Sequence, residues 1–455
     1  MHSINLHPPS RSENCVSCSG FASCLRFVGI LGLVLAQFWR GSTDAAPLPA
    51  ARQLDCAQTS AITSVPGSQA VHVGVQPLVL GASALTHHVF VAGTSACGGS
   101  GALVMLSDQT GTVLGWVPLD LGEGRVQLLL DEQAHRLLID HGVPYPHSMS
   151  IVNTLSGQLI RTVETGQLIA GLTLNERAHE FLVAIDPVGS PRSGNGHRAQ
   201  PEIRAMDSRT GESIWTAYPG IGSIPRFVGA AASPIVSDGL HHLLYVSGSR
   251  GVGVFFSATG AHRGTLHLGP CGGELALRAS VSRLYTASEG VMRDRYNSSN
   301  PQVNPPGYFC VVDAAKGKVL RKVQGHPGST ALVLGNVPQS PRLLVATQES
   351  MGAIRTTVRD ANSGAIVRGD LSVRFPPFPT SDPASPLIYF ASDLRQDTKS
   401  STEVVTIRQY NTRINKATVV LPSAPYPTAL AAVPSTKRLF LGVAGVDVVV
   451  IVQLH

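Results

Sequence analysis

Short apolar runs recur along this chain, and each one stands between polar, turn-forming residues. A run such as residues 89–93 (VFVAG) is too short for a buried helix and is typical of a buried strand. Neighbouring runs start between 41 residues (Leu243 to Leu284) and 62 residues (Phe181 to Leu243) apart. The eight runs begin at Val89, Leu137, Phe181, Leu243, Leu284, Leu343, Leu387 and Leu439.

A unit of this length holds four short strands, which is the construction of one blade of a β-propeller. The sequence therefore predicts an all-β fold, a single closed propeller of four-stranded blades, over residues 70–455. Eight repeats predict eight blades. Seven is the alternative if the proline-interrupted unit around residues 375–388 is irregular.

Tight turns are predicted between the third and fourth strands, where Asp, Asn or Ser precedes Gly. Asp and Asn side chains bond to nearby backbone N–H groups, and Gly adopts positive φ without steric cost. The turns lie at 108–111, 153–157, 207–211, 257–260, 313–317 and 360–364. Turns between the first and second strands are marked by His87, His135, His179 and His241, which stand on four different blades and so do not predict a metal site.

Ring closure is predicted at the termini. The last unit ends after its third strand, VVVIVQL, so it lacks a fourth strand of its own. Residues 70–75 (AVHVGV) precede the first complete unit and are expected to supply it, which removes an exposed sheet edge.

The apolar run at residues 27–39 predicts export. Its 13 residues are short for a membrane-spanning helix, and small residues follow it, with Ala45 and Ala46 beside the expected cleavage point. Residues 1–46 are therefore assigned to a signal peptide, with an uncleaved membrane anchor as the alternative, and residues 47–69 to a linker. The expected location is extracytoplasmic: secreted, periplasmic or at the cell surface.

The cysteine content of the exported part allows two disulfides, as an oxidising compartment permits. Four cysteines allow three pairings, and buried free thiols are the alternative. The candidates are Cys56, Cys97, Cys271 and Cys310. The formal charge of +6 is spread along 455 residues without a basic cluster interleaved with aromatics, so no nucleic acid partner is expected.

One blade carries a recognisable motif. Residues 203–215 (IRAMDSRTGESIW) resemble the Ala-x-Asp-x-x-Thr-Gly-x-x-x-Trp blade motif of the quinoprotein alcohol dehydrogenase-like propellers, and residues 106–116 are similar. The repeats also resemble the broader YVTN-type group. The resemblance implies blade construction rather than catalysis. Only three Trp occur and no two cysteines are adjacent, so no cofactor is expected, with a metal ion or quinone as the alternative.

Long connections between second and third strands, or between blades, gather on one face of a propeller and indicate where it binds. A charged and aromatic set in one such loop is a candidate for binding an anionic ligand or a protein partner, and solvated loop charge with a local ion pair is the alternative. A second set is a further candidate for ligand or partner binding, and a metal site formed by its histidines together with His326 is the alternative. The first comprises Glu289, Arg293, Asp294, Arg295 and Tyr296, and the second His141, Tyr145, His147 and His197.

No nucleophile elbow, HExxH motif or phosphate-binding glycine loop occurs in the sequence. The leading hypothesis is an exported, non-catalytic propeller that binds an unknown protein or small ligand through its loop-rich face. The alternatives are a metal- or quinone-dependent enzyme of lactonase or dehydrogenase type, and a propeller subunit of an electron-transfer complex.

Overall fold

A computed structural model describes residues 67–454 except for 96–99, 123–125, 143–146, 188–199, 226–232, 289–306, 325–329, 336–341, 351–352, 372–379, 382–385 and 397–402. These residues form strands β1 to β32 and one 3-10 turn, η1 (Ala279–Val281). No helix of the described part is long and apolar enough to cross a membrane. The all-β prediction is confirmed.

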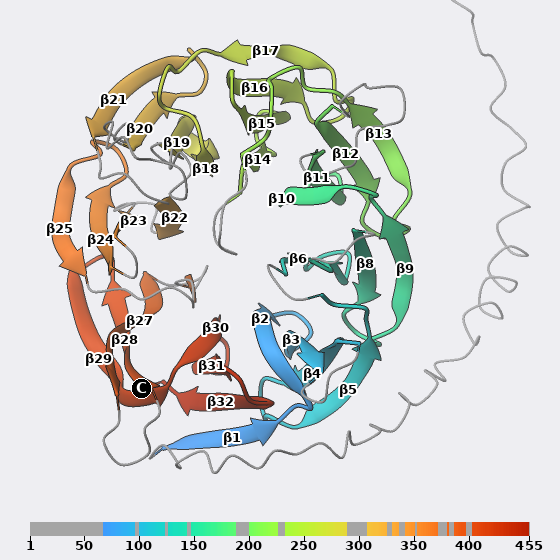
Figure 1. Ribbon diagram of the computed structural model, residues 1–455, viewed down its shortest axis with the longest axis vertical. Coiled ribbons are helices and arrows are strands. Elements are labelled where there is room, and N and C mark those ends of the chain that lie inside the picture. The colour runs from blue at the N-terminus through green and yellow to red at the C-terminus, as the bar shows by residue number, and fades with distance from the viewer. Residues whose placement is uncertain are drawn as a thin grey trace, which may run out of the picture. The chain divides into compact units, whose positions relative to one another are not determined.

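The strands form eight antiparallel sheets of four strands, so the prediction of eight blades is confirmed. Figure 1 shows the sheets around a ring, with the first strand of a blade toward the centre and the fourth at the rim. Blade 1 comprises β2 (Val75–Ser83), β3 (His88–Ser95), β4 (Ala102–Ser107) and β5 (Val113–Pro118). Blade 2 comprises β6 (Leu128–Asp131), β7 (Arg136–Asp140), β8 (Ser148–Asn153) and β9 (Leu159–Glu164). Blade 3 comprises β10 (Leu168–Asn175), β11 (Glu180–Asp186), β12 (Glu202–Asp207) and β13 (Ser213–Ala217). Blade 4 comprises β14 (Ile235–Asp238), β15 (Leu243–Gly248), β16 (Gly251–Phe256) and β17 (His262–Leu266).

The second half of the ring repeats this order. Blade 5 comprises β18 (Glu274–Arg278), β19 (Arg283–Ser288), β20 (Tyr308–Asp313) and β21 (Lys318–Gln324). Blade 6 comprises β22 (Thr330–Gly335), β23 (Arg342–Ser350), β24 (Ala353–Asp360) and β25 (Ile366–Leu371). Blade 7 comprises β26 (Thr380–Ser381), β27 (Leu387–Gln396), β28 (Glu403–Asn411) and β29 (Lys416–Pro425). Blade 8 comprises β30 (Pro427–Val433), β31 (Arg438–Val443), β32 (Val448–Gln453) and β1 (Ser68–His72).

The hydrophobic core lies between neighbouring blades. Phe90 and Met105 of blade 1 pack with Leu137 and Ile139 of blade 2, and comparable clusters fill the other blade interfaces. The second strand of a blade is thus covered on both faces, as the wholly buried β11 illustrates. This is why the eight runs are continuously apolar instead of alternating.

The first and last strands along the chain close the ring. β1 pairs antiparallel with β32, and Ser68 lies opposite Val452. One core cluster joins Val91 of blade 1 to Phe440 of blade 8. The predicted closure is confirmed, with β1 beginning two residues before the predicted position 70.

The turns between third and fourth strands are built as predicted. Asp207 Oδ1 accepts hydrogen bonds from the backbone N–H groups of Arg209 and Thr210, both at 2.8 Å. Blade 1 differs by one position, because Ser107 Oγ accepts from the N–H of Thr110 at 3.2 Å while the Asp108 side chain is buried.

The recurrent histidines mark a backbone feature of the turn between first and second strands. One histidine of each of these turns has a left-handed backbone, with φ of 55–56°, at His87, His135, His179 and His242. Its carbonyl accepts a hydrogen bond of 2.8–3.0 Å from the neighbouring turn of the same blade, at the backbone nitrogen of Asp108, Thr154, Ser208 or Ser257. Histidine is enriched at this backbone conformation, which gives the recurrence a structural cause. In blade 4 the position belongs to His242, not His241.

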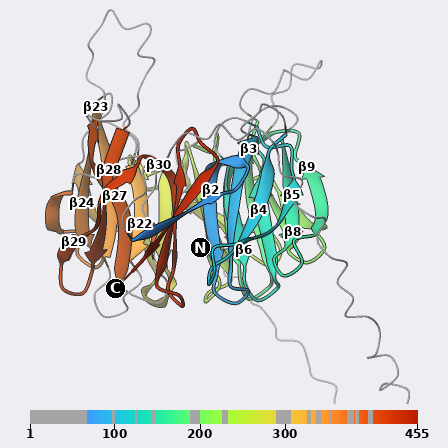
Figure 2. The same cartoon turned by 90° about the horizontal axis from the view of Figure 1, so that it is seen from below.

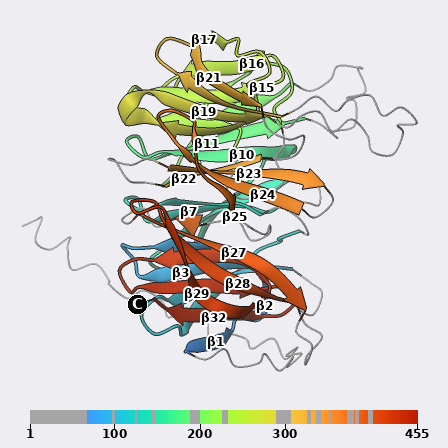
Figure 3. The ribbon, with the colours of Figure 1, turned by 90° about the vertical axis from the view of Figure 1, so that its left-hand side faces the viewer.

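The ring therefore has two distinct faces. We call the side with these tight turns the turn face, and the side with second-to-third-strand and blade-to-blade connections the loop-rich face. Figures 2 and 3 show the ring edge-on, with the strands running between the two faces and the C-terminal end on the turn face.

Candidate functional site

The longest connection between successive strands, residues 289–307, leaves the loop-rich face from the hairpin of β19 and β20. The predicted binding residues on it lie outside the described residues: Glu289, Arg293, Asp294, Arg295 and Tyr296. The described hairpin beneath them, which we call the stem, is the candidate site.

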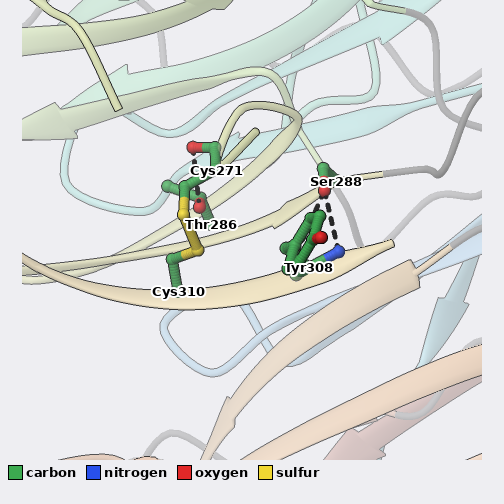
Figure 4. Close-up of a disulfide and its surroundings, with 5 residues drawn as sticks. All are labelled: Cys271, Thr286, Ser288, Tyr308 and Cys310. Carbon is green, nitrogen blue, oxygen red and sulfur yellow. Dashed lines mark hydrogen bonds between the residues drawn. A yellow bond between two sulfur atoms is a disulfide. The ribbon is translucent and has the colours of Figure 1, made fainter. Parts of the chain in front are cut away.

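A disulfide fixes the stem to the connection from blade 4. Cys271 is bonded to Cys310 of β20, and their Cα atoms are 5.7 Å apart. Thr286 of β19, opposite Cys310, donates its hydroxyl hydrogen to the Cys271 carbonyl at 2.9 Å. Figure 4 shows the disulfide and the hydrogen bond from Thr286 to Cys271 next to each other. Cys56 and Cys97 lie outside the described residues.

Hydrogen bonds close the end of the stem. The Tyr308 backbone N–H donates to Ser288 Oγ at 2.9 Å, and the Ser288 hydroxyl also approaches the Tyr308 carbonyl at 3.3 Å. The Lys322 ammonium lies 4.0 Å from the centre of the Tyr308 ring, a cation–π contact. The two strands are thus held together where the long connection departs.

The blade-to-blade connection is also packed tightly on the stem. The Gly273 N–H donates to Ser247 Oγ of blade 4 at 2.8 Å. Gly273 has φ of +116°, and a Cβ there would collide with the Ala287 carbonyl. Only glycine fits this close backbone approach, so the stem is anchored to two blades.

His141 is a structural residue of blade 2. Its side chain is buried, and its Nε2 and Nδ1 atoms lie 2.8 Å from Ser150 Oγ and 2.9 Å from Ser148 Oγ. Burial lowers the pKa of the imidazole, and the charge of Asp120 opposes this shift. With both ring nitrogens in hydrogen bonds, His141 has no free nitrogen for a metal ion in this arrangement.

His147 is the other described member of the second candidate set. His147 Nδ1 lies 3.1 Å from the Gly142 carbonyl and helps to close the same loop. Tyr145, His197 and His326 lie outside the described residues. Within the described ranges, no three His, Cys, Asp or Glu side chains form a group able to hold a metal ion.

The resemblance to quinoproteins draws attention to tryptophan and cysteine residues, and Trp215 and the paired cysteines make structural contacts in this fold. Trp215 donates its indole N–H to the Ser257 carbonyl of the next blade at 3.0 Å and lies against Gly260. The disulfide joins residues 39 positions apart instead of an adjacent pair.

Blade 7 adds a charged pair that the sequence analysis missed. Arg408 donates to Asp393 Oδ2 at 2.8 Å, and this hydrogen bond lowers the pKa of Asp393. Asp393 has φ of 51° and lies at a register shift in β27. The only sequence signal was the polar sequence SDLRQ, which interrupts the strand after Ala391.

Comparison with known proteins supports the fold alone. No family model and no curated protein matches this chain. Among solved structures, Sqt1 of Saccharomyces cerevisiae has a TM-score of 0.55 and 9% identity, covering 85% of this chain and 98% of Sqt1. The C-terminal WD40 domain of Sif2 has 0.53 and 10%, covering 86% and 100%. BamB of Moraxella catarrhalis has 0.51 and 13%, covering 86% and 100%. These are β-propeller proteins, and at such identities the likeness extends to architecture only.

Proposed function

We propose that this protein is an exported, non-catalytic β-propeller that binds a protein partner through its loop-rich face, with the stem as a rigid mount. The observation that carries the proposal is the cross-linked base beneath the longest connection of the ring. A fixed base lowers the entropy lost when a loop binds a partner. The blades supply the rest of the rigid support.

The Cys271–Cys310 disulfide supports export. Structural disulfides persist in oxidising compartments and are rare in the cytosol. Together with the apolar run at residues 27–39, it supports an extracytoplasmic location.

The side chains on the long connection support a partner with an acidic surface. Arg293, Arg295 and Tyr296 belong to the residue types enriched at binding hot spots, and an Arg guanidinium binds a carboxylate through two parallel hydrogen bonds. In this proposal the arginines contact the partner and the stem holds their loop.

Affinity capture from the source cell tests the proposal. The Arg293→Ala/Arg295→Ala variant is expected to bind the partner captured by wild type at least about tenfold more weakly, because a buried charged contact is worth more than 1.4 kcal/mol. Arg161→Ala/Arg263→Ala removes the same charge from exposed positions on β9 and β17 and is expected to bind as wild type does. Equal binding by both variants, or no partner for wild type, would contradict the proposal.

Metal analysis and an absorption spectrum of the chain, purified without chelator, test the enzyme alternative. The proposal expects a colourless protein without stoichiometric metal. A bound metal or a quinone band would favour the enzymatic or electron-transfer hypothesis.

A further inference from the structure

Apolar side chains stand exposed at the tips of the tight turns on the turn face. Five tips on blades 1, 2, 4, 5 and 7 are between 42% and 63% exposed, at Leu85, Leu155, Leu240, Val281 and Ile414. They take no part in the clusters between blades. Removing such side chains from water is favourable, and each tip is a separate apolar contact point on the same face of the ring.

The same turns are basic. Exposed Lys and Arg side chains in and directly beside the described turns are Arg177, Arg209, Lys316, Lys318, Arg413, Lys416 and Lys437. The exposed carboxylates of these turns are Glu176 and Glu212. Cations therefore outnumber anions among the exposed side chains of the described turn face.

Among the other acidic groups of this face, Asp207 and Asp360 are partly exposed and accept hydrogen bonds within their own turns, and further carboxylates are turned inward. Asp131 and Asp238 are buried. The Glu132 carboxylate accepts hydrogen bonds from Ser83 Oγ at 2.7 Å and from the Ala84 N–H at 3.0 Å. These carboxylates are therefore engaged in hydrogen bonds within the fold, whereas the lysine and arginine side chains of the turns are exposed to solvent.

The N-terminal segment joins the ring on this face. Ser68 pairs with Val452, and the Leu454 N–H donates to the carbonyl of Lys437, a turn-face residue, at 2.7 Å. Residue 67 therefore lies at the turn-face edge. The apolar run at 27–39 precedes this point in the chain, and residues 40–66 between them could span up to roughly 90 Å if extended.

We propose that the turn face docks on the surface of a bilayer that contains anionic phospholipids. Apolar tips that enter the headgroup region, next to cations that attract its phosphates, are the two contributions that bind peripheral proteins to such membranes. This orientation directs the loop-rich face to the aqueous phase, and it stands independently of the proposed partner.

Vesicle sedimentation with the full chain tests the docking. Wild type is expected to bind phosphatidylcholine vesicles more tightly when they contain phosphatidylglycerol, and high salt should weaken the difference. Arg413→Glu/Lys416→Glu is expected to reduce partitioning onto the anionic vesicles by more than about tenfold, since each cation near the surface contributes about fivefold. Leu155→Ser/Ile414→Ser is expected to weaken it as well.

The matched control changes the loop-rich face. Tyr218→Ser/Arg250→Glu replaces an exposed apolar body and a cation there and is expected to bind as wild type does. Thermal unfolding of each variant shows that it is folded. Turn-face variants that bind anionic vesicles as tightly as wild type would overturn the proposal.

A fluorescence measurement separates docking from insertion of the N-terminal run alone. In a Trp39→Phe background, which removes the tryptophan of the apolar run, Leu155→Trp is expected to shift the tryptophan emission to shorter wavelength when anionic vesicles are added, and Tyr218→Trp is not. An unchanged Leu155→Trp spectrum with bound protein would overturn the proposal. Binding of polyglutamate through the turn face, without vesicle binding, would replace the bilayer by an acidic protein and also overturn it.

Discussion

Single residues connect neighbouring blades through glycine turns. The Trp215 ring lies against Gly260 of the next blade, and its indole N–H bonds to Ser257. Gly211 meets Ile151 and Arg161 of the preceding blade in the same way. The turn glycine therefore has two roles: it adopts the positive φ of the turn, and it leaves room for a side chain of the neighbouring blade.

Gly260→Ala tests this double role. Gly260 has φ of +67°, and a Cβ there would lie 2.7 Å from Trp215 Cζ3, whereas Gly166 has φ of +64° and no atom within 4 Å. Gly166→Ala is expected to cost about 1–2 kcal/mol of unfolding free energy from backbone strain alone. Gly260→Ala is expected to cost about 1–3 kcal/mol more because of the steric overlap. Denaturant unfolding measures both, and equal losses would contradict the contact role.

His141 is expected to make stability dependent on pH. Its folded pKa is lowered by burial, so the unfolded chain takes up this proton first, near pH 6.5. Stability from this residue is full above about pH 6.5 and falls as pH drops toward the lowered folded pKa, by no more than about 1.4 kcal/mol per pH unit.

His141→Gln is expected to remove this component from the difference in unfolding free energy between pH 7.5 and 5, as urea unfolding would show. His262→Gln, on the exposed β17, is the matched control and should keep the wild-type dependence. The same pH dependence in wild type and His141→Gln would contradict the assignment.

Sequence alone identified Cys271 and Cys310 but not their pairing. Pairing depends on β20 bringing Cys310 next to the connection from blade 4, a contact 39 residues away in sequence. The inward role of His141 likewise depends on Ser148 and Ser150 of the following strand. Side-chain partners of this kind follow from register, which a residue pattern specifies only coarsely.

Among the elements, the stem is the one on which the proposed partner binding depends. Cys271→Ala/Cys310→Ala is expected to lower the free energy of unfolding by about 2–4 kcal/mol. A reducing agent is expected to destabilise wild type and to have no such effect on the double variant. Denaturant titrations with and without reductant measure both, and an unchanged wild type in reductant would show that the disulfide does not support the stem.

The second strands were the elements best predicted from sequence, because burial on both faces makes them continuously apolar. Outer strands such as β9 are largely exposed, so they have no continuous apolar run. Their positions were predicted from the turns that precede them. β26 has two residues, Thr380 and Ser381, in the proline-interrupted unit. The sheet is four-stranded there because Thr380 and Ser381 still pair with Tyr389 and Ile388 of β27.

At the scale of the whole molecule, stability depends on the closure by β1. Deleting residues 1–72 removes five cross-strand pairs with β32, each worth about 0.2–1 kcal/mol. The expected loss of unfolding free energy is about 1–5 kcal/mol, with aggregation through the exposed β32 edge. A peptide of residues 66–74 should restore part of the loss, and an unchanged midpoint in the deleted chain would contradict the closure.

The two faces of the ring are built from different kinds of connection. Long connections and the stem occupy one face, while short turns with apolar tips and cations occupy the other. The rhythm of the repeats predicted both faces. It did not predict that the turn face carries exposed apolar tips and cations, because these residues are scattered along the sequence. Only the closed ring places them on one face.

Photo-crosslinking in the source cell is the most direct test of partner binding on the loop-rich face. A benzophenone side chain placed at Tyr218 or Arg250 on that face, or at Leu155 or Ile414 on the turn face, reports which protein lies within reach. If the partner binds on the loop-rich face, we expect a discrete protein adduct from the positions on that face and none from the turn-face positions. A protein adduct from the turn face alone, or none from the loop-rich face, would contradict it.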